Sequence, residues 1–139
     1  MEKLVQIGSG HTLGIAASYV AALIVLGVVL AVRVIAIRRS QKIGLGDGEN
    51  RTLTRRIRAH GNFSEYAPLL MIAVLALPLL GAKEWLIHLV GGVGLLGRVL
   101  HGIGISQSGG ASLPRVGGMM LTLSALLIGA GALLTLAWR

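Results

Sequence analysis

The amino-acid sequence predicts an all-α integral membrane protein built as a four-helix bundle. Four apolar segments, each long enough to cross a bilayer, occupy most of the 139 residues. Hydrophobic residues make up 54% of the chain and charged residues 13%, well below the roughly 25% of soluble domains. Because these segments leave no room for a separate soluble domain, we expect residues 1–139 to form a single four-span membrane domain.

The first span is expected at residues 12–37. At 1.5 Å per residue its length is about 39 Å, enough to cross a hydrocarbon core of ~30 Å with some tilt. We expect no cleavable signal peptide, because this apolar run is too long and a charged region follows it. The glycine-rich turn 44–48 resembles a phosphate-binding loop, but no strand precedes it, so we interpret it as a flexible connection.

The second span is expected at residues 53–80, with Thr52 or Thr54 as the residue that caps its start. Pro68 and Pro78 lie inside this segment. A proline removes one backbone donor and bends the helix, which membranes tolerate where a neighbour satisfies the freed carbonyl.

The third span is expected at residues 85–105 and the fourth at residues 116–138. Both are rich in small residues, which let helix backbones approach closely in a membrane. The glycines concerned are Gly91, Gly92, Gly94, Gly97, Gly117, Gly118, Gly129 and Gly131.

The net charge of +8 is concentrated between Arg33 and Arg58, where eight cations accompany two acids. A basic loop between two spans is first a topology signal, so we expect no nucleic-acid partner. Counting Lys and Arg places the loops 38–55 and 106–115 in the cytoplasm and both termini on the opposite side. We expect a multi-pass protein of a bacterial inner membrane. Cysteine is absent, which excludes thiol chemistry by the protein itself, and we expect no metal.

Five polar residues share one face at the start of the second span. Their spacings of 4, 3, 4 and 3 residues keep the side chains on one side of an α-helix. An ionisable residue inside a span costs several kcal/mol unless it is paired or hydrated, and therefore marks a functional site. The five residues are Arg51, Arg55, Arg58, Asn62 and Glu65.

A second polar group comes from the third and fourth spans. Arg98 reaches a depth similar to that of Glu65 from the basic side, so we expect an ion pair within about 4 Å. His101 lies one turn from Arg98, and Arg115 opens the fourth span at the same face. A purely structural alternative remains open, in which this pair locks two helices and the outer arginines anchor the protein to anionic lipid.

A pocket with several arginines, an amide and a carboxylate suits a small, polyanionic, partly zwitterionic ligand. Guanidinium groups grip carboxylates in a bidentate manner, while Asn62 or Glu65 can take an ammonium or amide group. Glutathione has this chemistry, and a nearby guanidinium favours the reactive thiolate form of its thiol. We expect glutathione as a co-substrate.

Two sequence motifs support this interpretation. The segment RIRAHGNFSEYAP at residues 56–68, together with GRVLH at residues 97–101, resembles the MAPEG family, the membrane-associated proteins in eicosanoid and glutathione metabolism. The four-span layout is similar to the small bacterial branch of that family. The resemblance implies a homotrimer that binds glutathione between neighbouring protomers in the cytoplasmic half.

The resemblance also implies roles for individual residues. It implies that Arg115 stabilises the glutathione thiolate and is the catalytic residue. The first-span arginine of the family matches Arg38, although Arg39 is an alternative. Together with the polar face, the expected glutathione-binding residues are Arg38, Arg55, Arg58, Asn62, Glu65, Arg98 and His101.

Two departures argue against eicosanoid synthesis. Gly61 stands where several eicosanoid-making members have an arginine, and Ile105 stands where they have a tyrosine near the thiol. We therefore expect a glutathione-dependent transferase or peroxidase that acts on hydrophobic electrophiles from the bilayer. The main alternative is a non-catalytic protein of the same fold that binds lipid or a small molecule. A third reading, a cation exporter using Glu65, is weakened by the expected pairing with Arg98.

Overall fold

The computed structural model describes residues 2–139, with side chains described from Gly10 onward. It contains four helices, and no strand occurs in this described part of the chain. Each helix is long and apolar enough to span a membrane. The helices are α1 (Glu2–Gln41), α2 (Arg51–Leu79), α3 (Glu84–Gln107) and α4 (Leu113–Ala137). The predicted all-α membrane bundle is therefore confirmed.

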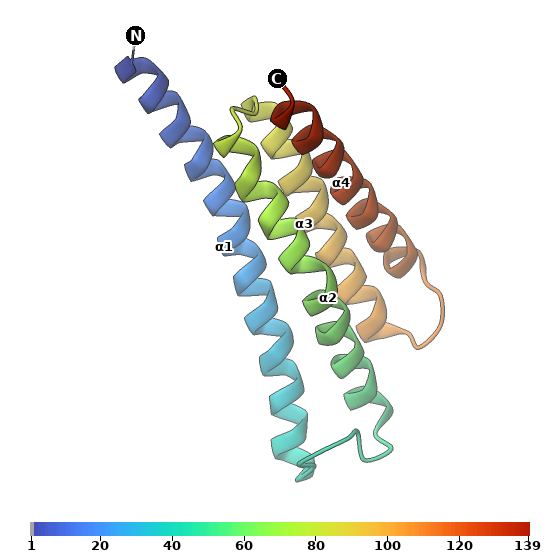
Figure 1. Ribbon diagram of the computed structural model, residues 1–139. Coiled ribbons are helices and arrows are strands. Elements are labelled where there is room, and N and C mark those ends of the chain that lie inside the picture. Colours follow the sequence, from blue (N-terminus) through green and yellow to red (C-terminus); the bar gives the residue numbers. More distant parts are fainter. Residues whose placement is uncertain (1) are drawn as a thin grey trace.

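The helices run alternately up and down, so that both termini lie at one end of the bundle (Figure 1). The connections 42–50 and 108–112 lie at the other end. Helix α1 extends well beyond the predicted 12–37. Its 40 residues span about 60 Å, which is twice the ~30 Å thickness of the hydrocarbon core. The apolar run predicted only the part of α1 that crosses the bilayer, whereas the same helix continues into polar sequence at both ends.

Helix α3 packs against all three other helices, and a different glycine makes room for each neighbour. A Cβ atom on Gly91 would lie 2.6 Å from the Tyr19 ring of α1, and one on Gly97 would lie 2.6 Å from the Thr122 hydroxyl of α4. At Gly94 the same atom would overlap a leucine of α2. The prediction that small residues permit close helix approach is confirmed for α3.

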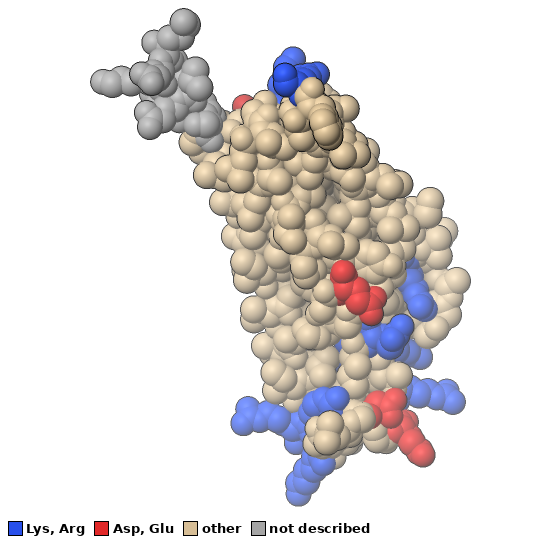
Figure 2. Space-filling model, viewed as in Figure 1, with Lys and Arg blue, Asp and Glu red and all other residues tan. Residues whose placement is uncertain are grey.

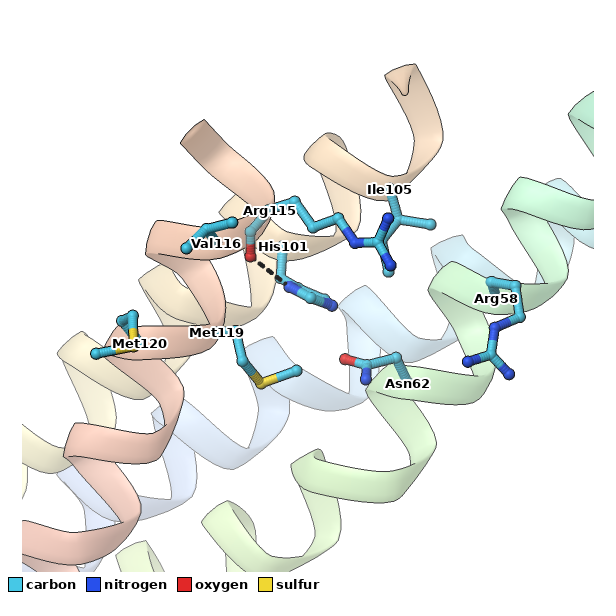
Figure 3. Close-up of a pocket in the computed structure, with 8 residues that line it drawn as sticks. All are labelled: Arg58, Asn62, His101, Ile105, Arg115, Val116, Met119 and Met120. Carbon is cyan, nitrogen blue, oxygen red and sulfur yellow. Dashed lines mark hydrogen bonds between the residues drawn. The ribbon is translucent and has the colours of Figure 1, made fainter. Parts of the chain in front are cut away.

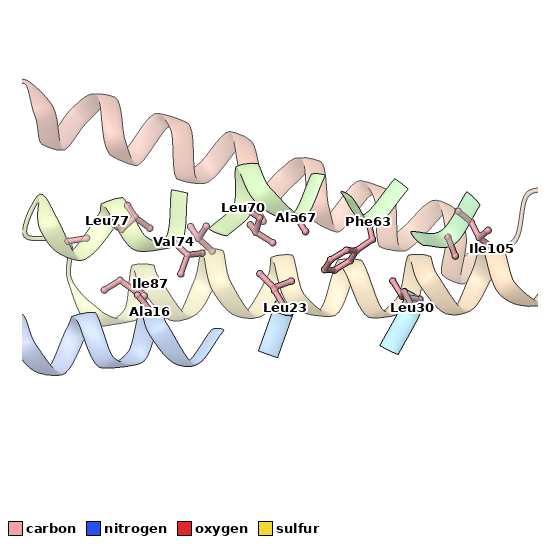
Figure 4. Packing of buried hydrophobic residues seen from close by; sticks show 14 residues of the cluster. Ala16, Leu23, Leu30, Phe63, Ala67, Leu70, Val74, Leu77, Ile87 and Ile105 are labelled. Carbon is pink, nitrogen blue, oxygen red and sulfur yellow. The ribbon is translucent and has the colours of Figure 1, made fainter. Parts of the chain in front are cut away.

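Apolar side chains from all four helices form one buried cluster along the bundle (Figure 4). Burial of such side chains between helices supplies the van der Waals contacts that hold membrane helices together. The fully buried members of this cluster include Leu23 of α1, Leu70 and Leu77 of α2, Val90 of α3 and Ala125 of α4.

Helix α2 begins at Arg51, and its cap is Asn50 rather than the predicted threonines. The Asn50 side-chain oxygen accepts hydrogen bonds of 3.0 Å from the backbone N–H groups of Thr52 and Leu53. Asparagine is among the strongest capping residues because its oxygen reaches the free amides of the first turn. The cap defines where the polar part of α2 starts.

The loop before α2 is held by Asp47, although the sequence predicted a flexible connection. One carboxylate oxygen accepts a hydrogen bond of 2.7 Å from the Thr54 hydroxyl, and the other accepts one of 3.1 Å from the Glu49 amide. These bonds hold the pKa of the Asp47 carboxyl below its ordinary value of 3.8, because they stabilise the charged form. The loop is thus tied to the first turn of α2.

Lys and Arg side chains gather at the end of the bundle that carries the connections 42–50 and 108–112 (Figure 2). The middle of the surface in this view is largely uncharged. Large apolar side chains are exposed along the helices, among them Ile72, Leu127 and Val25 at more than half of their maximum exposure. An apolar belt with one basic end is the pattern expected of a protein embedded in a bilayer.

Candidate functional site

Arg98 is the most deeply buried charged residue among those the structure describes, with 2% of its surface exposed. Its Nε donates to Thr122 Oγ1 at 2.8 Å, its Nη1 donates to Asn62 Oδ1 at 2.9 Å, and its guanidinium lies 5.2 Å from the centre of the Tyr66 ring. Neutral side chains from α2 and α4 therefore solvate the charge that α3 carries. A buried charge is tolerated only when its donors are satisfied in this way.

The predicted ion pair between Glu65 and Arg98 is wrong for the protomer. No salt bridge joins them in the described part of the chain, and the Glu65 side chain is exposed on the outside of the bundle. Glu65 and Arg98 reach a similar depth in the membrane, but depth alone does not determine in which direction each side chain points around its helix axis. Arg98 therefore does not neutralise Glu65 within the protomer, and the expected pairing does not weigh against a cation exporter.

Two residues that the sequence did not predict for this site, Thr122 and Tyr66, contact Arg98. Thr122 accepts from Arg98 and donates its own hydroxyl proton to the Gly118 carbonyl at 2.9 Å, so both functions of the hydroxyl are used. Tyr66 presents its ring face to the guanidinium, a favourable cation–π arrangement. The available signal was spacing, because Tyr66 lies four residues after Asn62 and therefore near the same face of α2.

Asn62 has a fixed orientation. A guanidinium can only donate, so the Asn62 oxygen must be the group that faces Arg98, and the Asn62 amide NH₂ is turned elsewhere. Asn62 also lines a cavity at the basic end of the bundle. The residue therefore offers this cavity donors rather than an acceptor, which suits a carboxylate or carbonyl and not an ammonium group.

The close crossing of α3 and α4 brings the other site residues together. A Cβ on Gly118 would overlap the His101 backbone amide, and one on Gly104 would overlap the Arg115 backbone amide. The two helices approach so closely that the His101 ring reaches the Arg115 carbonyl oxygen, 2.7 Å from Nδ1. Small residues at this crossing therefore position both His101 and Arg115.

The cavity has a volume of about 300 Å³ and lies between α2, α3 and α4 (Figure 3). Polar side chains line one part of it and apolar side chains, two of them methionines, line the rest. No carboxylate is among the lining residues. The residues are Arg58, Asn62, His101, Ile105, Arg115, Val116, Met119 and Met120. A volume of this size and mostly apolar walls with a few converging polar groups are typical of small-molecule sites.

Two further cavities adjoin the first through shared arginines. One, of about 220 Å³, is lined by Arg55, Arg58 and Arg115 among others, and another, of about 370 Å³, by Arg38 and Arg58 among others. Arg55 also donates to the Gln107 carbonyl at 3.2 Å, which ties α2 to the end of α3. Arg58 thus lines all three cavities, and the third also carries the carboxylate of Asp47.

The expected site residues therefore fall into three groups. The first group, Arg58, Asn62, His101 and Arg115, lines the central cavity. The second, Arg38 and Arg55, lines the two adjoining cavities. Arg98 lines none of the three and donates a hydrogen bond to the Asn62 side chain. Glu65 lines none of these three cavities in the protomer. The assignment of these residues to ligand binding remains a prediction.

Fold and cavity together define a class: a multi-pass membrane protein of four helices with a basic, partly apolar cavity at one end. The chain belongs to the MAPEG family, whose sequence model matches residues 16–135. It is also 37% identical over 68 residues to the inner membrane protein YecN, in each of two strains of Escherichia coli. That match covers 49% of this chain and 52% of YecN, so the chain spans about half the length of these curated relatives.

Proposed function

We propose that this protein is a membrane-embedded, glutathione-dependent transferase or peroxidase acting on hydrophobic electrophiles. The observation that supports this proposal is the central cavity, where two guanidinium groups and an amide donor face an apolar wall. Cationic and amide donors suit the carboxylates and peptide carbonyls of the tripeptide. The inner membrane location named for YecN is extended to this chain here, with the basic end of the bundle in the cytoplasm.

Each lining group has a distinct part in this proposal. Arg58 and the Asn62 amide hold carboxylate and carbonyl oxygens of glutathione, whereas the Arg115 guanidinium stabilises the charge on the ionised sulfur. The electrophile enters from the bilayer past Val116 and Met120, whose side chains are 52% and 61% exposed. The product is a thioether in the transferase reaction.

A homotrimer is part of the proposal. Glu65 lies about 10 Å further along α2 than Arg58 and is exposed, with no hydrogen bond or ion pair in the described part of the protomer. An uncompensated carboxylate facing hydrocarbon costs several kcal/mol, so a surface that carries one is better buried against another protomer. Glu65 then faces the neighbouring protomer or the ammonium group of glutathione.

One observation favours the non-catalytic alternative. Ile105, which is 6% exposed, occupies the cavity wall where eicosanoid-making relatives have a tyrosine, so no hydroxyl donor is available there. A protein of this fold that binds lipid or a small molecule without turnover would need no such group. Binding and turnover must therefore be measured separately.

The decisive experiment is a glutathione titration of the purified protein, followed by a turnover assay with a chlorodinitrobenzene. Arg58→Ala is expected to weaken glutathione binding at least tenfold, the loss expected for one charge-assisted contact. Arg139→Ala, which removes a cation at the opposite end of the bundle, is the matched control. Glutathione binding without turnover would favour the non-catalytic alternative, and absence of glutathione binding would refute the transferase and peroxidase proposal.

The trimer is tested by native mass spectrometry from mild detergent. We expect a three-subunit species that is weakened in Glu65→Gln and unchanged in Glu49→Gln, a loop substitution of the same chemistry. A monomer in the wild type would refute this part of the proposal without affecting the binding experiment.

A further inference from the structure

His101 carries a buried nitrogen with no hydrogen-bond partner. The residue is 5% exposed, and its Nε2 makes no hydrogen bond in the described part of the chain. In Figure 3 this nitrogen points from the ring into the space between Asn62 and the Arg115 guanidinium. A buried polar atom without a partner costs free energy of about 1–3 kcal/mol, so its presence in a cavity requires an explanation.

The protonation pattern of the neutral ring follows from its one contact. The Arg115 carbonyl can only accept, so His101 Nδ1 must carry the hydrogen in the 2.7 Å bond. In the neutral imidazole the other nitrogen then has a free lone pair, which makes Nε2 an acceptor. The structure thus presents a lone pair, fixed in direction by the backbone of α4, to the ligand cavity.

Some donors near this nitrogen are already bonded to other acceptors, and two others, the Asn62 amide and the Arg58 guanidinium, hold glutathione oxygens in the proposed site. The Arg98 guanidinium donates to Thr122, Asn62 and the Met119 sulfur, while Arg115 Nη1 donates to the carbonyls of two loop glycines. Ile105, across the cavity, has no polar atom. A group with an acidic hydrogen on the ligand is therefore the fitting partner for Nε2.

We propose that His101 Nε2 accepts the proton of the glutathione thiol and so acts as the general base of the reaction. This inference rests on the proposed glutathione site. The S–H bond breaks as the N–H bond forms, and the sulfur electron pair attacks the electrophilic carbon. With a chloroaromatic acceptor, the S–C bond forms and the C–Cl bond breaks, chloride leaves with the bonding pair, and the imidazolium releases its proton to water.

The charges around His101 distinguish this proposal from activation by arginine alone. The charged groups near the ring are cations: Arg58 and Arg115 line the same cavity, Arg98 lies about one turn away on α3, and no carboxylate is among the cavity's lining residues. A proton on the imidazole is therefore stabilised only when a thiolate shares the cavity. In an arginine-only mechanism the thiol proton leaves for solvent, whereas a base retains it in the site.

The test uses the purified full-length protein in detergent with glutathione and a chlorodinitrobenzene. His101→Asn keeps an amide donor near the Arg115 carbonyl but places no base at Nε2, and His101→Gln places there an amide that cannot take a proton. His60→Gln, on α2 outside the three cavities, is the matched control. Glutathione affinity, thiolate absorbance, proton release to a weak buffer and the pH dependence of turnover are measured for each.

We expect wild-type protein to form thiolate without releasing an equivalent number of protons. Both His101 variants should bind glutathione within about threefold of wild type and lose at least tenfold in turnover, as expected when a general base is removed. One proton released per thiolate in the wild type would overturn the proposal even if the variants did not fold. Equal turnover in His101→Gln and His60→Gln would overturn it while leaving the glutathione site intact, and failure of the wild type to bind glutathione would overturn both.

Discussion

Arg98 Nε and Thr122 Oγ1 are joined by a 2.8 Å hydrogen bond, through which α4 supplies an acceptor for the charge that α3 carries into the membrane. The same hydroxyl donates to the Gly118 carbonyl of its own helix. Thr122 therefore connects the charge to the helix crossing that forms the cavity. Loss of this single oxygen affects both the burial of the charge and the geometry of the site.

Thr122→Val should destabilise the protein by about 1–3 kcal/mol, because it leaves a buried charged donor without its acceptor while preserving side-chain shape. Thermal unfolding in detergent measures the effect. Thr135→Val is the control, since among the described residues the exposed Thr135 hydroxyl bonds only to the Ala132 carbonyl of its own helix. Equal stability of the two variants would contradict the assigned role of Thr122.

Two adjacent glycines in α4 should respond oppositely to alanine. At Gly118 the added Cβ would overlap the His101 amide and lie 2.6 Å from the Gly97 carbonyl oxygen, whereas at Gly117 nothing lies within 4 Å. Gly118→Ala should cost about 1–3 kcal/mol because the helices are forced apart. Gly117→Ala should be neutral or stabilise by up to about 1 kcal/mol through helix propensity. Comparable melting temperatures would argue against the close crossing.

Arg115→Ala and Arg58→Ala should separate chemistry from binding. Arg115 holds His101 through its backbone carbonyl, so the alanine variant removes the guanidinium and keeps that contact. Turnover should fall and its pH dependence should move upward, toward the ~8.5 of an unassisted thiol, with a smaller loss of affinity. Arg58→Ala should mainly weaken binding. If both variants lost glutathione affinity equally and the pH dependence of turnover did not move, Arg115 would only anchor the bundle and would not act on the thiol.

The Asp47–Thr54 contact should make stability depend on pH. The pKa of Asp47 is lower in the folded protein than its ordinary 3.8, so its contribution is present above pH 3.8 and is lost as the pH falls from 3.8 through the lower pKa of the folded state. Thr54→Val should therefore lower the melting temperature at neutral pH, with the difference from wild type shrinking in acid. Thr52→Val, at an exposed position two residues earlier, should show no such pH-dependent difference.

Much of the fold was predictable, because apolar length and the distribution of Lys and Arg determine spans directly. Four of the expected site residues also meet at one cavity, since spacing along α2 and α3 fixes which residues share a face. Helix ends were less predictable. Asn50 was not recognised as the cap of α2, because two nearby threonines are also capable of capping a helix.

The direction in which a side chain points around its helix was harder to predict from the sequence, as Glu65 and Tyr66 show. Glu65 follows Asn62 by three residues, which leaves it about 60° short of a full turn, whereas Tyr66 follows by four and overshoots by about 40°. In the structure this difference turns Glu65 outward and places the Tyr66 ring on Arg98. Thr122 was missed because one hydroxyl in an apolar helix gives no charge signal.

The arrangement around Arg98 has a consequence for biosynthesis. The chain emerges from the ribosome in order, so the third segment reaches the insertion machinery with its guanidinium while the fourth segment, which carries the acceptor for Nε, is still inside the ribosome. An arginine at the centre of an inserting segment costs about 2.5–3.5 kcal/mol in transfer from the translocon. Asn62 and Tyr66 of α2 precede Arg98 in the chain and can contact its guanidinium first, whereas the hydrogen bond from Nε forms only after the fourth segment has entered the membrane.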